Sequence, residues 1–307
     1  MNVFFSSDIS KAKEIFETAG FSKIIFQDDA VALKIHFGEP GNTAYLKPDR
    51  VSPIARLIRQ LGGCPFWTDA NTLYQGKRND NETHLQTAHE HGYTLANTGA
   101  EAIIADEPGD PRGRELAVNY PHFKKLYVAA GTLTAGAMIV LTHFKGHETT
   151  GFGGALKNIG MGLGSKLGKL KMHQDCLHCP EVKTCRKNQT LEACWFGSPE
   201  LVQEKIAEYA AGIAAQFKGK IAYINFITDV SPNCDCYPRN DPPVVPDIGI
   251  AASFDPVALD QACVDLVNKA AGNDKFRALW PAVDWGIQLS HAEKIGLGSR
   301  KYALVVK

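Results

Sequence analysis

Four cysteines are gathered in one stretch of nineteen residues, with the spacing C-x2-C-x5-C-x8-C. They are Cys176, Cys179, Cys185 and Cys194. Four thiolates so close in sequence can surround a zinc ion or hold an iron–sulfur cluster, whereas calcium and magnesium prefer oxygen ligands. The spacing matches neither the bacterial nor the plant ferredoxin pattern, so it predicts a metal site without selecting the metal. Four unrelated free thiols, or a redox pair at the first two positions, are the alternative.

A second group of cysteines, Cys234 and Cys236, lies in a proline-dense loop on either side of one aspartate. Two cysteines at this spacing can reach one metal ion from two sides, and they can equally be free thiols. The stretch MNVFFSSDISKAKEIF has no basic segment followed by a long apolar run, so neither a signal peptide nor disulfides are expected. Cys64 and Cys263 lie in apolar patterns and are predicted to be core thiols.

The third group is His143-x3-His147-x9-Lys157, which is interleaved with glycines. Imidazole titrates near neutral pH, so the two histidines suit general acid–base catalysis or metal ligation. Glycines let a backbone approach a ligand closely, and amides at a helix start can bind an anion beside Lys157. The glycines predicted to contact a ligand are Gly151, Gly153, Gly154, Gly160 and Gly162. The alternative is a tight connection from strand to helix, because no Walker pattern is present.

The elements that must position these groups alternate between strands and helices. Strands are expected at 24–26, 31–35, 64–68, 126–130, 137–142, 221–227, 248–252 and 302–306, and the main helices at 52–61, 81–91, 199–217 and 256–269. This alternation predicts an α/β fold with a mostly parallel or mixed sheet flanked by helices, interrupted by an irregular cysteine-rich metal-binding insertion. Ligands of such sheets bind beyond the carboxyl ends of strands, so the loops 36–48 and 69–80 are predicted walls of a site. Plain connecting loops are the equal alternative.

Composition excludes several classes of partner. The 307 residues carry a formal net charge of +0, which gives no electrostatic basis for binding nucleic acid. The longest apolar stretch, 128–141, is shorter than the roughly 20 residues that span a bilayer, so no membrane partner is expected. A cytoplasmic protein is expected. It is predicted to be a single unit over 1–307, with a division into two lobes at about 1–142 and 143–307 as the alternative, and with the cysteine module at 173–194.

Several long motifs resemble the DUF362 family, whose members are described as uncharacterised iron–sulfur centre proteins. They are KIHFGEPGNTAYLKP, KGHETTGFGGALKNIGMGLGSKLGKLKMH, NCDCYPRNDPPVVPDIGIAASFDPVALDQACVDLV and HAEKIGLGSRKYAL, which together span nearly the whole chain. The resemblance implies an α/β fold, often with ferredoxin-type cysteine repeats after a Met-His pair. Met172-His173 is that pair here, but CLHCPEVKTCRKNQTLEAC stands in place of a standard ferredoxin module. The resemblance implies a fold and a cofactor, and no reaction.

A shorter similarity concerns His147 and Lys157 alone. A histidine followed ten residues later by a lysine, across a glycine-rich turn, is similar to the lactate- and sugar-racemase family that uses a nickel-pincer nucleotide. The match is local, and a shared fold element would produce it without shared chemistry.

These observations lead to three hypotheses about function. The first is an iron–sulfur or other metal-binding protein with a redox or electron-transfer role and a redox partner protein. Its cluster, of the 4Fe–4S type, would be held by the four cysteines of 176–194, with Cys234 and Cys236 nearby or as alternates. The second is a metal-assisted enzyme, racemase- or isomerase-like, that acts on a small anionic ligand; His143 or His147 would be the acid–base group and Lys157 the anion contact. The third is a structural zinc protein.

Overall fold

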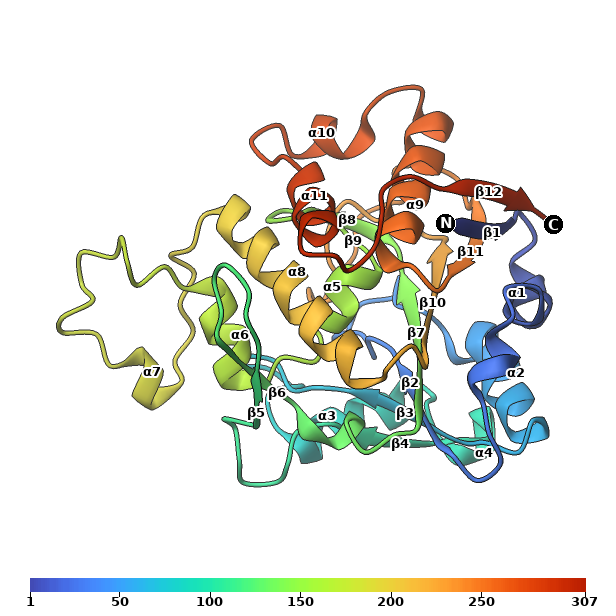
Figure 1. Ribbon diagram of the computed structural model, residues 1–307, viewed down its shortest axis with the longest axis horizontal. Helices are drawn as coiled ribbons and strands as arrows, with labels where there is room; N and C mark the ends of the chain where they lie inside the picture. Colours follow the sequence, from blue (N-terminus) through green and yellow to red (C-terminus); the bar gives the residue numbers. More distant parts are fainter.

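Eight strands form one sheet at the centre of the molecule, and the computed structural model describes all residues, 1–307 (Figure 1). In spatial order the strands are β12 (Ala303–Val306), β1 (Asn2–Ser6), β11 (Gly249–Ser253), β10 (Ile221–Ile227), β7 (Ala137–His143), β2 (Ala30–Lys34), β3 (Cys64–Asp69) and β4 (Glu101–Ile104). Only β11 runs against its neighbours β10 and β1, and every other pairing is parallel. The predicted α/β fold with a mostly parallel sheet is therefore confirmed. The sheet also joins strands from both of the lobes that the sequence suggested.

Two small hairpins lie outside the main sheet. One pairs β5 (Arg114–Ala117) with β6 (Lys125–Val128), and the other pairs β8 (Lys145–His147) with β9 (Gly151–Gly153). The second hairpin follows β7 after one residue and precedes the short helix α5 (Ala155–Gly160), so it sits at the carboxyl edge of the sheet.

Helices cover both faces of the sheet (Figure 1). On one face α1 (Ala12–Thr18) and α2 (Pro48–Gln60) share a core with Ile139 and Leu141 of β7. On the other face α5, α8 (Pro199–Gln216) and α9 (Pro256–Ala271) pack against Met138 and Val140 of the same strand. Because successive side chains of β7 are buried on opposite faces, its unbroken apolar run is explained by a central position. The remaining helices are α3 (Asn81–Glu90), α4 (Leu95–Thr98), α6 (Lys166–His173), α7 (Lys187–Thr190), α10 (Lys275–Leu279) and α11 (Gly286–Lys294).

Two local predictions are wrong. Residues 24–26 form no strand; Phe21–Ile24 is a short 3-10 helix, and Ile24 and Ile25 are buried in the core beside α2. Cys64 is exposed because it is the first residue of β3, where the alternating burial of the strand begins at the rim of the sheet. Cys263 is buried in α9 as expected.

The segment from the end of α6 to the start of α8 stands apart from the layers and carries only the four-residue helix α7 (Figure 1, yellow-green, left). None of the helices is both long and apolar enough to cross a bilayer.

Candidate functional site

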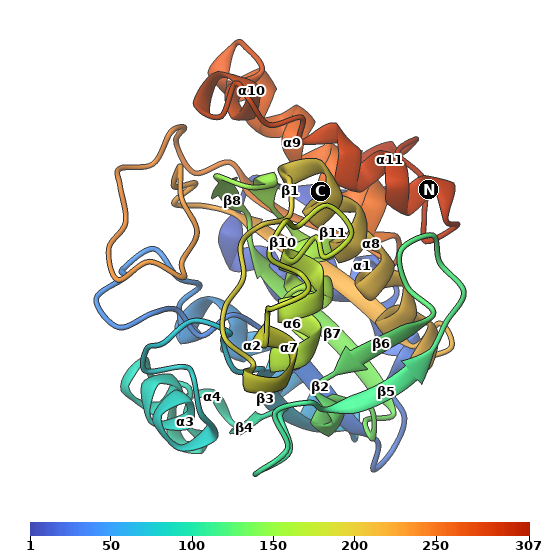
Figure 2. The ribbon, with the colours of Figure 1, turned by 90° about the vertical axis from the view of Figure 1, so that its left-hand side faces the viewer.

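A cavity of about 820 Å³ opens at the carboxyl edge of the parallel strands. Its walls come from the loops that follow β2, β3, β7 and β10, together with α5 and α6. The loops after β2 and β3 thus line a cavity, as the alternation of strands and helices predicted. Figure 2 shows the loop after β10 beside the loop after β2, and the two are joined by hydrogen bonds from Asn42 to the carbonyl oxygens of Tyr237 (3.1 Å) and Arg239 (3.2 Å).

The Cys-Asp-Cys segment of the β10–β11 loop presents its side chains in two directions. Cys234 and Cys236 line the cavity, whereas Asp235 is buried away from it. The Asp235 carboxylate lies 2.8 Å from Nδ1 of His143 and 3.2 Å from Nζ of Lys145. Burial alone would raise the pKa of Asp235, but the positive charges of His143 and Lys145 hold it below its ordinary value. Asp235 therefore anchors the loop as a carboxylate.

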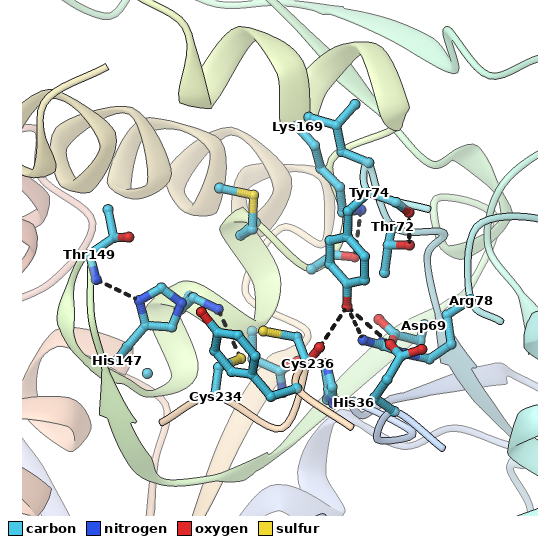
Figure 3. A pocket seen from close by; sticks show the side chains of 18 of the residues that line it. His36, Asp69, Thr72, Tyr74, Arg78, His147, Thr149, Lys169, Cys234 and Cys236 are labelled. Carbon is cyan, nitrogen blue, oxygen red and sulfur yellow. Dashed lines mark hydrogen bonds and ion pairs between the residues drawn. The ribbon is translucent and has the colours of Figure 1, made fainter. Parts of the chain in front are cut away.

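Cys234 is the thiol best placed to ionise. Its side chain is buried beside that of Cys236 (Figure 3), and Nζ of Lys157 lies 3.7 Å from its sulfur. The hydrogen bond donated by Cys236 lowers the pKa of the Cys234 thiol well below its ordinary value, against the effect of burial and with help from Lys157 and His147. The same hydrogen bond raises the pKa of Cys236, because that thiol must keep its proton to donate. One thiolate is thus stabilised beside one thiol.

The backbone fixes the tautomer of His147. The amides of Thr149 and Thr150 donate to its Nδ1, at 3.1 and 3.3 Å (Figure 3). A nitrogen that accepts these bonds carries no proton, so the proton of the neutral ring is on Nε2. His147 hydrogen-bonds to Cys234 and lowers the pKa of that thiol, and Nε2–H is the group available to donate. In this form His147 is a hydrogen-bond donor and not a metal ligand through Nε2.

His143 is engaged on both ring nitrogens. Nδ1 faces Asp235, and Nε2 lies 2.8 Å from the carbonyl oxygen of Thr228. Both partners are acceptors, so the ring has no free nitrogen to offer a substrate, although it lines the cavity. The structure places this predicted acid–base residue as a support for the Cys-Asp-Cys loop.

The opposite end of the cavity is built on a buried ion-pair network that the sequence did not single out. Arg78 lies 3.0 Å from Glu39 and 3.5 Å from Asp69, and donates to the hydroxyl of Tyr74 at 2.7 Å (Figure 3). Lys34 lies 3.0 Å from Asp69. Because these cations neutralise both carboxylates, they leave no unpaired negative charge at this end of the cavity. The sequence signal was that Glu39, Asp69, Tyr74 and Arg78 all fall within the two loops predicted to be walls of a site.

Lys169 of α6 is a second cation that the sequence did not single out. It lines the cavity, and its Nζ donates to the carbonyl oxygens of Gly164 (2.5 Å) and Gly162 (3.5 Å). The ammonium group has three N–H bonds, and these two carbonyl oxygens accept two of them, so one N–H remains for a ligand. Burial lowers the pKa of Lys169 to about 8. At pH 7 most of the Lys169 side chain therefore remains an ammonium ion, which can pair with an anion that enters the cavity.

The predicted glycines serve close packing more than ligand contact. A Cβ at Gly154 would lie 2.3 Å from Oδ1 of Asp260, and one at Gly160 would lie 2.3 Å from the carbonyl oxygen of Ile206. Gly151 has a φ of +74°. Asp260 accepts from the amides of Ala155 (2.8 Å) and Leu156 (2.9 Å), the first of α5. The sequence predicted that the amides at the start of this helix could bind an external anion. In the structure the Asp260 carboxylate already accepts the first two amides of α5. Of the five glycines, Gly153, Gly154 and Gly162 line the cavity.

The four cysteines of 176–194 lie on the projecting segment, outside the cavity lining. Cys185 is exposed, the other three are half-buried, and none forms a disulfide. No three of their sulfur atoms lie within 4.8 Å of one another, so this arrangement does not converge on a single zinc ion. A four-iron cluster spaces its thiolates more widely than one ion does, and the cluster stays a prediction. Only the flanking residues His173 and Trp195 reach the cavity.

Comparisons with known proteins place these features in a family. Comparison with curated proteins gives no match. Among solved structures, the lactate racemase apoprotein from Thermoanaerobacterium thermosaccharolyticum is similar, with 16% sequence identity and a TM-score of 0.42. The alignment covers 74% of this chain and 51% of that protein, so the chain spans about half of its length. The family model described as "Domain of unknown function (DUF362)" matches residues 31–265, and the chain therefore belongs to the DUF362 family.

Proposed function

We propose that the protein is an enzyme that binds a small organic anion in the cavity and uses the Cys234 thiolate as its reactive group. One observation carries the proposal: a buried thiol in the wall of an 820 Å³ cavity has a lysine ammonium 3.7 Å from its sulfur. The ammonium ion stabilises the thiolate, which is the nucleophilic form of cysteine. A thiol with a purely structural role does not need to be ionised.

The charges of the lining support an anionic ligand. Lys157 and Lys169 enter the cavity from α5 and α6, and neither is paired with a carboxylate of the chain. The carboxylates of Glu39 and Asp69 are compensated by Arg78 and Lys34. A carboxylate of the substrate would therefore meet the free N–H of Lys169 at one end, while its reacting carbon faces Cys234 at the other.

Three residues have distinct roles in the proposed reaction. The Cys234 thiolate adds to a carbonyl carbon of the bound carboxylate compound; the S–C bond forms, and the electron pair of the C=O bond moves to oxygen. The Lys157 ammonium gives that oxygen a proton and takes it back when the S–C bond breaks. His147 donates its Nε2–H to the sulfur of Cys234 and holds the thiolate in place, as a neutral hydrogen-bond donor and not as a base. This role replaces the acid–base role that its spacing suggested.

A metal-assisted enzyme is the second candidate, because Cys236 and Cys234 are hydrogen-bonded to each other and both line the cavity. Two adjacent sulfurs suit a soft metal ion, which would act as a Lewis acid when bound. His147 does not complete the ligand set while Nδ1 accepts two amides. A redox or electron-transfer role through an iron–sulfur cluster at 176–194 remains a separate proposal.

The proposal is tested by comparing an anionic with a neutral alkylating agent. Iodoacetate and iodoacetamide are reacted with the full chain in the presence of a chelator, and modification of each cysteine is followed by peptide mass spectrometry. We expect the iodoacetate-to-iodoacetamide rate ratio at Cys234 to exceed that at the exposed Cys64 by about tenfold, as one unscreened ion pair would produce. Cys234 should also keep reacting at pH 6, because its pKa lies well below the ordinary thiol value.

Matched lysine variants locate the effect. Lys169→Met should lower the ratio at Cys234, whereas Lys166→Met should leave it unchanged, because Lys166 bonds to Asn79 and does not line the cavity. Equal ratios at Cys234 and Cys64 would exclude an anion-binding reactive thiol. A Cys234 that reacts only after a chelator has removed bound metal would favour the metal-assisted enzyme.

A further inference from the structure

A second group of ligand-type side chains lies away from the cavity, where three distant parts of the chain meet. His122 comes from the turn between β5 and β6, Glu204 and Glu208 from one face of α8, and His291 from α11. One ligand atom from each of His122, Glu208 and His291 falls within 4.8 Å of the others, and no other trio of histidine, cysteine and carboxylate residues in the chain does so.

The four side chains form a closed network. Nε2 of His122 lies 2.6 Å from Glu204, and Nε2 of His291 lies 3.0 Å from Glu208. Nδ1 of His291 is 3.6 Å from Glu204. The backbone amide of His122 donates to both oxygens of Glu208, at 3.1 Å each. The imidazoles are stacked, with ring centroids 5.7 Å apart.

This network holds two carboxylates without a lysine or arginine partner. Glu208 is 0% exposed, and no lysine or arginine nitrogen lies within 4.0 Å of it or of Glu204. A buried carboxylate needs a compensating positive charge, because its hydration is lost. Either the histidines are imidazolium ions or a cation occupies the centre. Two imidazoles and a carboxylate are a preferred ligand set for zinc and similar divalent ions.

A hollow adjoins the network. Its volume is about 410 Å³, and Glu204 and His291 lie in its wall beside Ser290, Arg277 and Arg300. A three-residue ligand set next to open space leaves a coordination position for water or an exogenous ligand, as in catalytic rather than structural zinc sites.

We propose that His122, Glu208 and His291 bind one zinc-type divalent metal ion, with Glu204 orienting the His122 ring and one coordination position facing the hollow. Bound metal neutralises the buried Glu208 and fastens the β5–β6 turn and α11 to α8. The site shares no residue with the cavity that Cys234 lines, so this proposal does not depend on the proposed function.

Cobalt(II) titration of the full, chelator-treated chain tests the site. Cobalt on nitrogen and oxygen ligands gives weak visible bands, whereas cobalt on thiolates adds a strong charge-transfer band, so the two kinds of site are separated in one spectrum. We expect one equivalent with the nitrogen–oxygen signature in the wild-type chain and in Cys234→Ser. His122→Gln should weaken it at least about 100-fold.

His122→Gln alters an exposed residue, so the fold should survive, and Glu208→Gln provides a second variant on a different element. His89→Gln, an exposed histidine on α3, is the matched control and should bind as the wild type does. The proposal is overturned if His122→Gln and Glu208→Gln both retain the wild-type signal. It is equally overturned if the wild-type chain shows only thiolate-bound cobalt, in which case imidazolium ions compensate Glu208.

Discussion

The consecutive residues Cys234, Asp235 and Cys236 have different roles because their side chains point in different directions. The segment is a turn, closed by the amide of Tyr237, which donates to the carbonyl oxygen of Cys234 at 3.2 Å; within it Cys234 and Cys236 line the cavity and Asp235 does not. The cysteines face the cavity, and Asp235 binds His143 and Lys145 behind it. The anchoring aspartate and the two cysteines that line the cavity are thus features of one short motif.

Replacing the anchor should destabilise the fold. We expect Asp235→Asn to lower the free energy of unfolding at pH 7 by about 3 kcal/mol, because it leaves His143 and Lys145 buried without their carboxylate. Urea unfolding measures the change. Asp284→Asn, which breaks an exposed pair with Arg277, is the control and should change stability by less than about 0.5 kcal/mol.

The difference between the wild type and Asp235→Asn should depend on pH in one direction. The pKa of Asp235 is lowered in the folded protein, so the unfolded chain takes up the proton first as the pH falls. The stabilisation is complete above the ordinary aspartate pKa of about 4 and is lost as the pH falls toward the folded value. The two unfolding free energies should therefore converge in acid. If the unfolding free energies of the wild type and Asp235→Asn differed by the same amount from pH 7 to pH 3, Asp235 would stabilise the fold through its packing and not through its charge.

The sequence identified some residues of the cavity and not others, for a physical reason. His147, Lys157 and the two cysteines have uncommon chemistry or spacing, so they were recognisable before their partners were known. Lys169 was one lysine among several in a helical stretch, and only the three-dimensional arrangement turns it toward the cavity. The tautomer of His147 depends on two backbone amides, which no residue type encodes.

At the scale of elements, α5 shows how a glycine-rich motif can serve packing. Asp260 of α9 accepts the first two amides of α5 and a hydrogen bond from Asn225 of β10 at 2.7 Å. Burial raises the pKa of Asp260 to about 6, although all three donors favour the carboxylate. Gly154 leaves the space that this carboxylate fills. The glycine pattern predicted a tight approach correctly, but the approaching group belongs to the chain.

A methyl group at this junction should be costly. Gly154→Ala would place Cβ 2.3 Å from the Asp260 carboxylate, and we expect a loss of about 3 kcal/mol in unfolding free energy, because α5 and α9 must separate. Gly153→Ala is the neighbouring control; its Cβ would meet Lys157 at 3.4 Å, an ordinary contact with a flexible side chain. Thermal or urea unfolding compares the two. Equal stability of both variants would show that the Asp260 contact is dispensable.

The cysteine segment is an element of a different kind. It projects from the layers (Figure 1), and Leu177 is 92% exposed. None of its four thiols lines the cavity, and only Cys194 packs against an apolar cluster, that of Leu73, Leu167 and Leu170. Its irregular form was predictable from composition, while its ligand was not, because the spacing fits several metals.

Anaerobic expression tests the proposed cluster on this segment. We expect iron and acid-labile sulfide in the purified chain, lost in Cys176→Ser/Cys179→Ser and retained in Cys234→Ser, because the two groups of cysteines lie on separate parts of the fold. Zinc without sulfide, or iron that disappears only with Cys234→Ser, would contradict the assignment.

At the scale of the whole molecule, the sheet order places every wall of the cavity at one edge. Strands β2, β3, β7 and β10 are neighbours and parallel, so the loops after them converge although they lie far apart in sequence. The alternation of strands and helices was enough to predict this convergence. The position of β11, which reverses direction and carries the Cys-Asp-Cys loop back across the edge, depends on pairings that strand patterns do not specify.

The bonds from Asn42 to the loop after β10 span 195 and 197 residues of sequence. Contacts of such range form late in folding, because a long chain segment must be closed before they can stabilise anything. During synthesis the N-terminal loop has no partner until β10 and its loop have left the ribosome. Cys234 is thus among the last groups to be enclosed, and in a newly made chain its thiol is accessible to oxidants until the cavity has formed.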